Sequence, residues 1–285
     1  MDGDSSDPFA SSLLLLCSSP VGVAFAALWG ALWGSFWNVC IYRVGLYESV
    51  VHPRSRCPRC GRGVAAWENV PIVSWIFLRG RCAGCALPIS MRYPLVELIG
   101  LGIGVALWER LVVRGVGDPV HLVAGFFLAF ALSGVLVVLS GIDFDHFIIP
   151  DRITYPAIPI FLVLALLVGD VPAKELVLGP VVGYALVAVT AEVGYLLMRR
   201  EVMGYGDAKL LAVIGAALGW RAPVFAFFAA PFAGLLVNIP ILLLRRKKVF
   251  GMVEVPYGPF LALAGFTYVF LSPFLAELLY SLSGN

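Results

Sequence analysis

The sequence predicts an all-α polytopic membrane protein, with about eight transmembrane helices and one cytoplasmic loop stapled by zinc. Three observations lead to this fold class. Of the 285 residues, 60% are hydrophobic and only 13% are charged, and the mean hydropathy is +0.93. A soluble protein of this length cannot bury so much apolar surface. The apolar residues also gather in long runs, and four of the six cysteines lie in one polar segment between them.

Eight apolar runs are candidate membrane-crossing helices, because a helix of about 20 apolar residues crosses roughly 30 Å of hydrocarbon. They cover residues 12–41, 95–113, 120–142, 153–169, 176–198, 208–220, 223–244 and 257–280. The run at 208–220 is short and Pro223 follows it closely, so this run and the next are candidates for a tight helical hairpin.

The distribution of basic residues predicts the orientation in the membrane. No lysine or arginine precedes Arg43, and three aspartates stand near the start, so the first run does not resemble a secretory signal peptide. With the N-terminus outside, the segments on the cytoplasmic side are residues 43–94, 143–152, 199–209 and 245–256. These segments hold sixteen of the twenty lysines and arginines. Basic residues favour the cytoplasmic side, so we expect this orientation.

Residues 43–94 form the only sizeable polar segment, and a segment this short needs a staple to fold. It contains two cysteine pairs, Cys57 with Cys60 and Cys82 with Cys85, separated by twenty-one residues. On the reducing side of a membrane this spacing favours a structural, tetrahedral zinc site with four thiolate ligands over disulfides. A redox role for either pair is the alternative interpretation. The predicted division is therefore a first span (1–42), a zinc-binding loop (43–94) and a seven-span membrane domain (95–285).

Two carboxylates stand where apolar runs meet the cytoplasmic surface. Asp207 lies in Gly204-Tyr205-Gly206-Asp207-Ala208-Lys209, directly before an apolar run. Asp143 directly follows another run, sixty-four positions earlier. A carboxylate at the edge of an apolar helix is costly, and it is a functional candidate for that reason. Two of them at matched depth indicate catalysis by an aspartate pair, with Asp145 as the competitor for the role of Asp143.

Simpler explanations exist for each carboxylate alone. Asp207 has the position of a residue that caps a helix N-terminus, and Asp143 that of a residue that ends a span. Asp151 is likewise expected to cap the helix that follows it.

With these motifs assembled, the chain resembles the type IV prepilin peptidases, also called prepilin leader peptidase/N-methyltransferases. The resemblance covers nearly the whole chain. It is carried by His52-Pro53-x-Ser55-x-Cys57-Pro58-x-Cys60, Cys82-x-x-Cys85, Ile89-Ser90-x-Arg92-Tyr93-Pro94, Ile142-Asp143 with Pro150-Asp151, and Gly204-Tyr205-Gly206-Asp207-x-Lys209. The last motif is shared with presenilin-like intramembrane proteases.

The resemblance implies two reactions in a bacterial inner membrane. One is cleavage of the leader of type IV prepilins or type II secretion pseudopilins after a glycine. The other is methylation of the new N-terminal residue with S-adenosylmethionine, an activity associated with the zinc loop. By motif position, Asp143 and Asp207 take the catalytic roles at the cytoplasmic face and the four cysteines bind zinc. The expected partners are prepilins or pseudopilins and membrane lipid, and no nucleic acid.

Two residues are candidates for binding the methyl donor. Gly34 lacks a side chain and would let a ligand approach, and Glu97 is an anionic group where the chain re-enters the membrane. Glu97 has a structural alternative, an ion pair with Arg92. Gly34 is also spaced four residues from Gly30, which is typical of close helix packing in lipid.

Two other classes of protein compete with the peptidase. A transporter also uses carboxylates within the membrane, but it leaves the cysteine loop unexplained. A zinc-stapled assembly scaffold explains the loop, but it leaves the Asp207 motif without a role.

Overall fold

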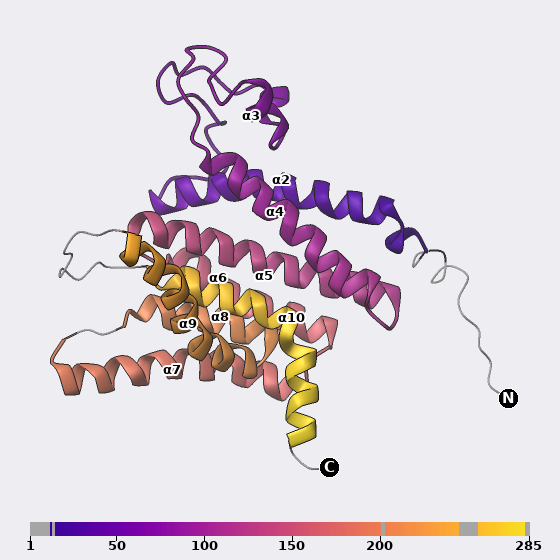
Figure 1. The fold of residues 1–285 in the computed structure, drawn as a ribbon, viewed down its shortest axis with the longest axis vertical. Helices are drawn as coiled ribbons and strands as arrows, with labels where there is room; N and C mark the ends of the chain where they lie inside the picture. Colours follow the sequence, from indigo (N-terminus) through magenta and orange to yellow (C-terminus); the bar gives the residue numbers. More distant parts are fainter. Residues whose placement is uncertain (1–11, 13–14, 201–202, 245–255, 283–285) are drawn as a thin grey trace. The chain divides into compact units, whose positions relative to one another are not determined.

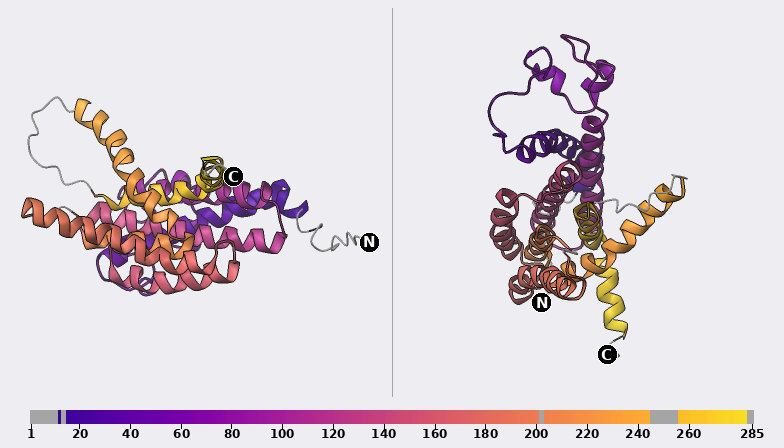
Figure 2. Two further views of the ribbon diagram at one scale, coloured as in Figure 1. Left: turned by 90° about the horizontal axis from the view of Figure 1, so that it is seen from below. Right: turned by 90° about the vertical axis from the view of Figure 1, so that its left-hand side faces the viewer.

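The computed structural model describes residues 12, 15–200, 203–244 and 256–282. Within that part of the chain the structure is helical and has no strand, only two isolated β-bridges in the cysteine loop. The chain forms two compact units, Met1–Gly134 and Val135–Asn285, which we describe separately (Figures 1 and 2). This boundary falls within a single helix and differs from the three-part division expected from the sequence, which stays a prediction.

The first unit contains α2 (Pro20–Gly45), the cysteine loop, α4 (Arg92–Trp108) with the π-helical turn η2 (Glu109–Val113), and the first part of α5 (Pro119–His146). Helix α2 begins at Pro20, because Ser19 accepts the N–H of Val21 as an N-cap and proline suits the first helical position. Residues 15–18 of the expected run form a short helical segment before Ser19.

Glycines bring α2 and α4 into close contact. A Cβ atom on Gly30 would lie 2.2 Å from the carbonyl oxygen of Gly100, and one on Gly104 would lie 2.4 Å from that of Ala26. Only residues without a side chain allow two backbones to approach this closely, which is a common device for helix packing in lipid. The packing role expected of the Gly30 and Gly34 spacing is confirmed.

Aromatic rings fill the space between these helices and α5. Trp108 packs edge-on against Phe126, with ring centroids 4.9 Å apart, and its indole N–H donates to the carbonyl oxygen of Cys17 at 2.9 Å. Trp37 packs on Phe130 at 5.5 Å. Buried aromatic pairs of this kind add about 0.5–1.5 kcal/mol each beyond the area they bury.

The second unit is built around α8 (Tyr205–Leu218), a helix of 14 residues. It contacts α6 (Asp151–Val168), α7 (Ala173–Met198), α9 (Arg221–Leu244) and α10 (Gly258–Leu282). From Leu210 to Ala217 every residue of α8 is buried. At the crossing of α7 and α8, a Cβ on Gly179 would lie 2.0 Å from the carbonyl oxygen of Gly215. The second unit therefore surrounds its shortest helix.

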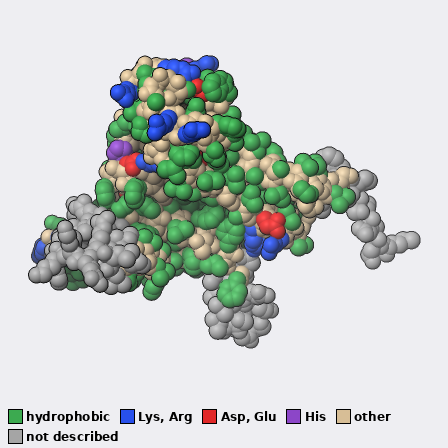
Figure 3. Space-filling view, turned by 45° about the horizontal axis from the view of Figure 1, so that its top comes forward, with side chains coloured by type: hydrophobic (Ala, Val, Ile, Leu, Met, Phe, Trp, Pro, Cys, Tyr) green, Lys and Arg blue, Asp and Glu red, His purple; other side chains and the backbone are tan. Residues whose placement is uncertain are grey.

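Each apolar run expected from the sequence is a helix in the structure. Five of these helices are long and apolar enough to cross a membrane: Pro20–Gly45, Pro119–His146, Asp151–Val168, Ala173–Met198 and Arg221–Ile239. The count of eight spans stays a prediction. Apolar side chains cover much of the face in Figure 3, as a lipid-facing surface requires. The basic cluster at 245–248 lies outside the described residues.

Candidate active site and metal centre

Asp143 lies in the last turn of α5 and is 7% exposed. Its Oδ2 atom accepts the backbone N–H of Gly258 at 3.0 Å, and Gly258 is the first residue of α10. A Cβ atom on Gly258 would lie 2.7 Å from the same oxygen, so a glycine is required for this contact. The carboxylate of Asp143 is thus held by the backbone of a helix start 115 residues further along the chain.

Asp207 lies in the first turn of α8 and is half-buried. Its carboxylate interacts electrostatically with that of Asp143, and Tyr257 is within electrostatic range of Asp207. The N-cap of α8 is Gly204, and no side chain caps this helix end. The structure thus brings Asp143 and Asp207 together and does not give Asp207 the role of an N-cap.

The two glycines of the Asp207 motif differ in their surroundings. A Cβ atom on Gly206 would lie 3.1 Å from Cβ of Ile149, which precedes α6, whereas the nearest atom to a Cβ on Gly204 is 4.0 Å away. Gly206 therefore permits the connection between α5 and α6 to approach the start of α8. Gly204 has extended backbone angles of −84° and 142° and an open side.

An ion pair fixes the start of α6 against α8. The ammonium group of Lys209 donates to the Asp151 carboxylate and lies 5.1 Å from the centre of the Tyr155 ring. The prediction that Asp151 caps α6 is wrong, because Pro150 is the N-cap and makes no side-chain cap bond. Asp151 is the first residue of the helix instead, where its charge also suits the helix dipole.

Two further details of this unit concern Glu192 and Asp145. Glu192, a charged residue within the apolar run at 176–198, accepts a hydrogen bond from the Tyr205 hydroxyl. Asp145, the competitor of Asp143, is exposed. Two residues along a helix turn the side chain by about 200°, so Asp145 points away from the site that Asp143 faces.

The cysteine loop contains two knuckles with the same backbone pattern, twenty-five residues apart. In the first, Cys57 N–H donates to Arg62 and Gly61 N–H donates to Cys57, at 2.9 Å each. In the second, Cys82 N–H donates to Leu87 at 2.8 Å and Ala86 N–H to Cys82 at 2.9 Å. A β-bridge closes each knuckle, Arg56 with Gly63 and Arg81 with Pro88. Gly61 and Ala86 hold equivalent left-handed positions, with φ of 71° and 57°.

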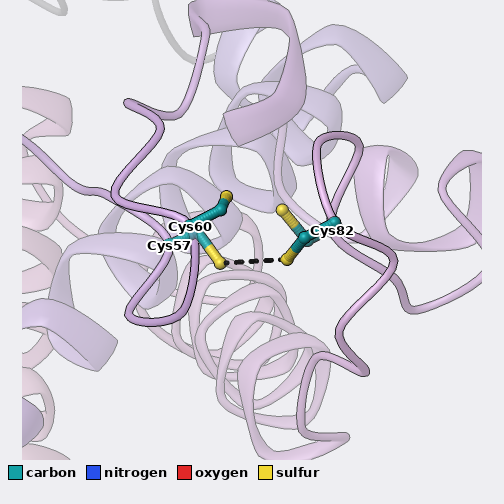
Figure 4. Close-up of side chains that lie close together, drawn as sticks. Cys57, Cys60 and Cys82 are labelled. Carbon is teal, nitrogen blue, oxygen red and sulfur yellow. Dashed lines mark hydrogen bonds between the residues drawn. The ribbon is translucent and has the colours of Figure 1, made fainter.

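The four sulfurs face one another across the two knuckles (Figure 4). All four lie within 4.8 Å of one another, and the sulfurs of Cys57 and Cys85 are 3.7 Å apart. A tetrahedral zinc ion with Zn–S bonds of about 2.3 Å requires sulfurs about 3.8 Å apart. The geometry therefore fits four thiolates around one metal ion.

The backbone and the neighbouring sulfurs shift the thiol pKa values in opposite directions. Backbone N–H groups of Cys60 and then Arg59 lower the pKa of Cys57 to about 6. At Cys85 the N–H of Leu87 lowers the pKa, but burial and the neighbouring sulfurs outweigh it and raise the pKa to about 11. Because a metal ion binds thiolates, metal binding at this cluster releases protons.

The first knuckle is tied to the turn η1 (Ala66–Asn69) through Glu68. The Glu68 carboxylate accepts the N–H of Ala65 at 3.0 Å and a guanidinium N–H of Arg62 at 2.9 Å. The Ala65 N–H, followed by Arg62, holds the pKa of Glu68 below its ordinary value. These bonds connect the metal-binding residues to the middle of the loop.

Gly34 and Glu97 are neighbours at the crossing of α2 and α4. A Cβ on Gly34 would lie 2.8 Å from Cα of Glu97, so the backbone of α4 fills the side that a ligand would need. Glu97 is 8% exposed, and its Oε2 accepts the N–H of Ile72 at 2.6 Å. Nearby, the Asn38 amide donates to the carbonyl oxygen of Tyr93 at 3.0 Å. This packing explains both residues without a ligand, and their role towards the methyl donor stays a prediction.

Comparisons with known proteins agree with these features. Residues 28–111 match the bacterial peptidase A24 N-terminal domain, and residues 130–239 match the type IV leader peptidase family. Three relatives carry the name prepilin leader peptidase/N-methyltransferase. The protein of Myxococcus xanthus is 41% identical over 79% of this chain and 64% of its own length. That of Aeromonas hydrophila is 40% identical over 75% of this chain and 70% of its length. That of Dichelobacter nodosus is 36% identical over 88% of this chain and 92% of its length.

No solved structure matches the chain. The first family match contains the cysteine knuckles together with Gly34 and Glu97, and the second contains Asp143 and Asp207. Several helices are long and apolar enough to cross a membrane. The chain is therefore a multi-pass membrane protein that belongs to the type IV leader peptidase family, with the prepilin leader peptidase/N-methyltransferases.

Proposed function

We propose that this chain cleaves the leader from type IV prepilins or type II secretion pseudopilins, after a glycine, and then methylates the new N-terminal residue with S-adenosylmethionine. The observation that carries the peptidase proposal is the pairing of Asp143 and Asp207 in one site, at the end of α5 and the start of α8. Two neighbouring carboxylates share a proton, because both cannot ionise without strong repulsion.

We assign the two carboxylates different roles. Asp143 accepts a backbone N–H from Gly258, and a hydrogen bond of this kind favours the ionised form of a carboxylate. The Asp207 carboxylate interacts electrostatically with Asp143, but it accepts no hydrogen bond from the residues that the structure describes. Asp143 is accordingly the base, and Asp207 holds the proton at the start of the reaction.

Hydrolysis then follows in two steps. Asp143 takes a proton from water while the water oxygen attacks the scissile carbonyl carbon, and the protonated Asp207 donates a hydrogen bond to the developing oxyanion. Collapse of the tetrahedral intermediate breaks the C–N bond, and a proton passes from the carboxyl pair to the leaving nitrogen. The products are the leader, with a new carboxylate, and the mature pilin, with a new amine.

The location of the site suits this substrate. The excess of basic residues in the segments 43–94, 143–152, 199–209 and 245–256 supports a cytoplasmic position for the loop and the carboxylates. We therefore place the N-terminus outside a bacterial inner membrane and the active site at the cytoplasmic face. A prepilin has a cytosolic leader followed by an apolar helix, so its scissile bond reaches the membrane at the same level.

The cysteine cluster is proposed as a structural zinc site. All four ligand positions of a tetrahedral ion are taken by Cys57, Cys60, Cys82 and Cys85, which leaves none for substrate. When bound, the ion supplies the link between the two knuckles. Gly34 and Glu97, which lie in the same unit, remain our candidates for a site that serves methyl transfer.

The peptidase proposal is tested by incubating the detergent-purified protein with a prepilin and following the leader-sized mass loss. Asp143→Asn and Asp207→Asn are each expected to abolish cleavage while the protein remains folded, because a neutral amide is neither a base nor an acid. Asp145→Asn is the matched control and is expected to retain activity, since Asp145 is exposed. Normal cleavage by Asp207→Asn would refute the mechanism. A transporter or a scaffold predicts no cleavage by any variant.

The methyltransferase proposal needs a variant that separates the two activities. Glu97→Gln keeps an acceptor for the Ile72 N–H and removes the charge. Cleaved but unmethylated product, measured by mass spectrometry on one prepilin, would support a role for Glu97 on the donor side. Equal loss of both activities would indicate a folding role, and unchanged methylation would remove Glu97 from the site.

A further inference from the structure

Helix α3 (Val73–Phe77), in the middle of the cysteine loop, presents an apolar face that its own loop does not cover. Val73, Ile76 and Phe77 follow the spacing of one helix face and are 47%, 61% and 82% exposed. Trp75 lies on the other side of the helix, where its indole N–H donates to the carbonyl oxygen of Ile89 at 3.3 Å. The helix is therefore amphipathic, with Trp75 facing the loop and the α3 face (Val73, Ile76 and Phe77) turned outward.

The loop holds the start of α3 beside the first turns of α4, a helix that the sequence predicts to cross the membrane. The N–H of Ile72, the residue before α3, donates to Glu97, which lies five residues beyond the start of α4 at Arg92. Five helical residues correspond to about 7.5 Å along the axis. Leu95 and Leu98, at the same level of α4, are 55% and 50% exposed. The start of α3 thus lies level with the turns at which α4 itself directs leucines outward.

The backbone around Ile72 is fixed at a cost. Ile72 has φ of 63° and ψ of −52°, a positive-φ conformation that a β-branched side chain rarely adopts. The hydrogen bond from its N–H to a buried carboxylate stabilises this conformation. The position of α3 against α4 is therefore set by a specific, strained contact and not by a freely moving connection.

Positive charge follows α3 directly in the chain. Arg79 and Arg81 come two and four residues after Phe77, and both are exposed. Apolar side chains flanked by arginines are typical of helices that lie in the interface of a membrane with anionic lipids. Arginines also gather over the loop in Figure 3.

We propose that α3 is an interfacial membrane anchor, whose Val73, Ile76 and Phe77 side chains enter the acyl boundary while Arg79 and Arg81 bind anionic lipid headgroups. The anchor fixes the cysteine loop on the membrane surface at one depth. This inference does not depend on either enzymatic activity. Lipid is the occupant because α3 begins level with the exposed leucines of α4 and is followed by two exposed arginines.

The test places an environment-sensitive fluorescent amino acid at Phe77 in the full-length protein. A second protein carries the same label at Arg59, an exposed position in the first knuckle. Both are reconstituted into vesicles of phosphatidylethanolamine and phosphatidylglycerol, with and without acyl-chain bromination. Zinc content of about one per chain confirms that each labelled loop is folded.

Brominated chains are expected to quench the label at 77 at least twofold more than the label at 59. Replacing phosphatidylglycerol by phosphatidylcholine, or Arg79 and Arg81 by glutamine, is expected to reduce that quenching. Equal, weak quenching at both positions would overturn the proposal. A blue-shifted label at 77 without quenching would also overturn it, since the face is then covered by protein, either this chain or a second copy. If quenching at 77 is the same with and without anionic lipid, the proposed contacts of Arg79 and Arg81 with lipid headgroups are refuted.

Discussion

Replacing Gly258 by alanine tests the geometry of the proposed active site without changing an ionisable group. The added Cβ would lie 2.7 Å from Oδ2 of Asp143 and 3.2 Å from its Cγ, whereas ordinary contacts begin at 3.4 Å. The carboxylate must therefore retreat by about 0.7 Å. Asp143 is 7% exposed and has little room to do so while keeping the N–H of Gly258 at 3.0 Å.

Two estimates give the size of the effect. Displacing a catalytic group by about 1 Å costs on the order of 100-fold in rate. Losing a hydrogen bond to a charged group costs about 1.5–3 kcal/mol, which corresponds to about 10- to 100-fold. We therefore expect Gly258→Ala to lower kcat/KM for prepilin cleavage by about 10- to 100-fold. The fold should survive, because alanine suits the first turn of a helix better than glycine does.

The assay compares initial rates of cleavage by purified variants, with the thermal unfolding midpoint measured alongside. Gly234→Ala is the matched control in the same unit, because its Cβ would meet only the Phe260 ring at an ordinary 3.7 Å. Its rate is expected to stay within about twofold of the unchanged protein. If Gly258→Ala cleaves at the normal rate while Asp143→Asn is inactive, the argument for the Gly258 contact is refuted.

Three other predictions follow from the ion pair and the cysteine knuckles. Lys209→Gln removes the ion pair with Asp151. Because the Asp151 side chain is 56% exposed, the free energy of unfolding should fall by no more than about 1 kcal/mol. A larger fall in stability, measured by thermal unfolding, would contradict a partly solvated pair. Elemental analysis of the unchanged protein should find about one zinc per chain, and the double variant Cys57→Ser with Cys60→Ser should lose it. Visible iron absorption in the unchanged protein would instead favour a redox centre. Ala86→Gly relieves a left-handed φ of 57° and should stabilise the second knuckle by up to about 1 kcal/mol. The expected result is slower release of zinc to a chelator, and faster release would show that the strain is not relieved.

The sequence predicts the helices well because lipid imposes a simple requirement. Every backbone group within the membrane must be bonded, so long apolar runs become helices. The four cysteines were also identifiable, since a tetrahedral thiolate site requires close pairs. The two aspartates were identifiable because a carboxylate at the edge of an apolar run is costly. In each case one physical constraint acts on neighbouring residues.

The contacts that complete the site leave weaker signals. Gly258 contributes a backbone N–H, a group that every residue except proline carries, so nothing in its identity marks it as the partner of Asp143. The residues Pro256-Tyr257-Gly258-Pro259 predict only an irregular helix start. Asp151 and Lys209 are fifty-eight residues apart, and their pairing depends on how α6 and α8 pack. The prediction of Asp151 as a cap failed because a local rule was applied to a long-range contact.

The tryptophans show the same limit. Trp67 and Trp75 both suit the headgroup level by composition, yet only Trp67, at 65% exposure, is open to the surroundings. The ring of Trp75 packs within the loop, 2.7 Å from where a Cβ on Gly80 would stand. Gly80 has φ of 65°, and this left-handed turn lets the chain fold over the ring. Composition predicts which residues suit an interface, but the turn decides which one faces it.

The length of α8 connects the fold to the chemistry. Its 14 residues span about 21 Å, less than the roughly 30 Å of the hydrocarbon layer, whereas its neighbour α7 has 26 residues. A short helix packed among longer ones must leave one of its ends below the membrane surface. The buried residues from Leu210 to Ala217 hold the later turns in the core, so the open end is the start, where Tyr205 is 47% exposed and which carries Asp207. The extended backbone at Gly204 and its open side then give water a route to the carboxylates, which hydrolysis at the edge of a membrane requires.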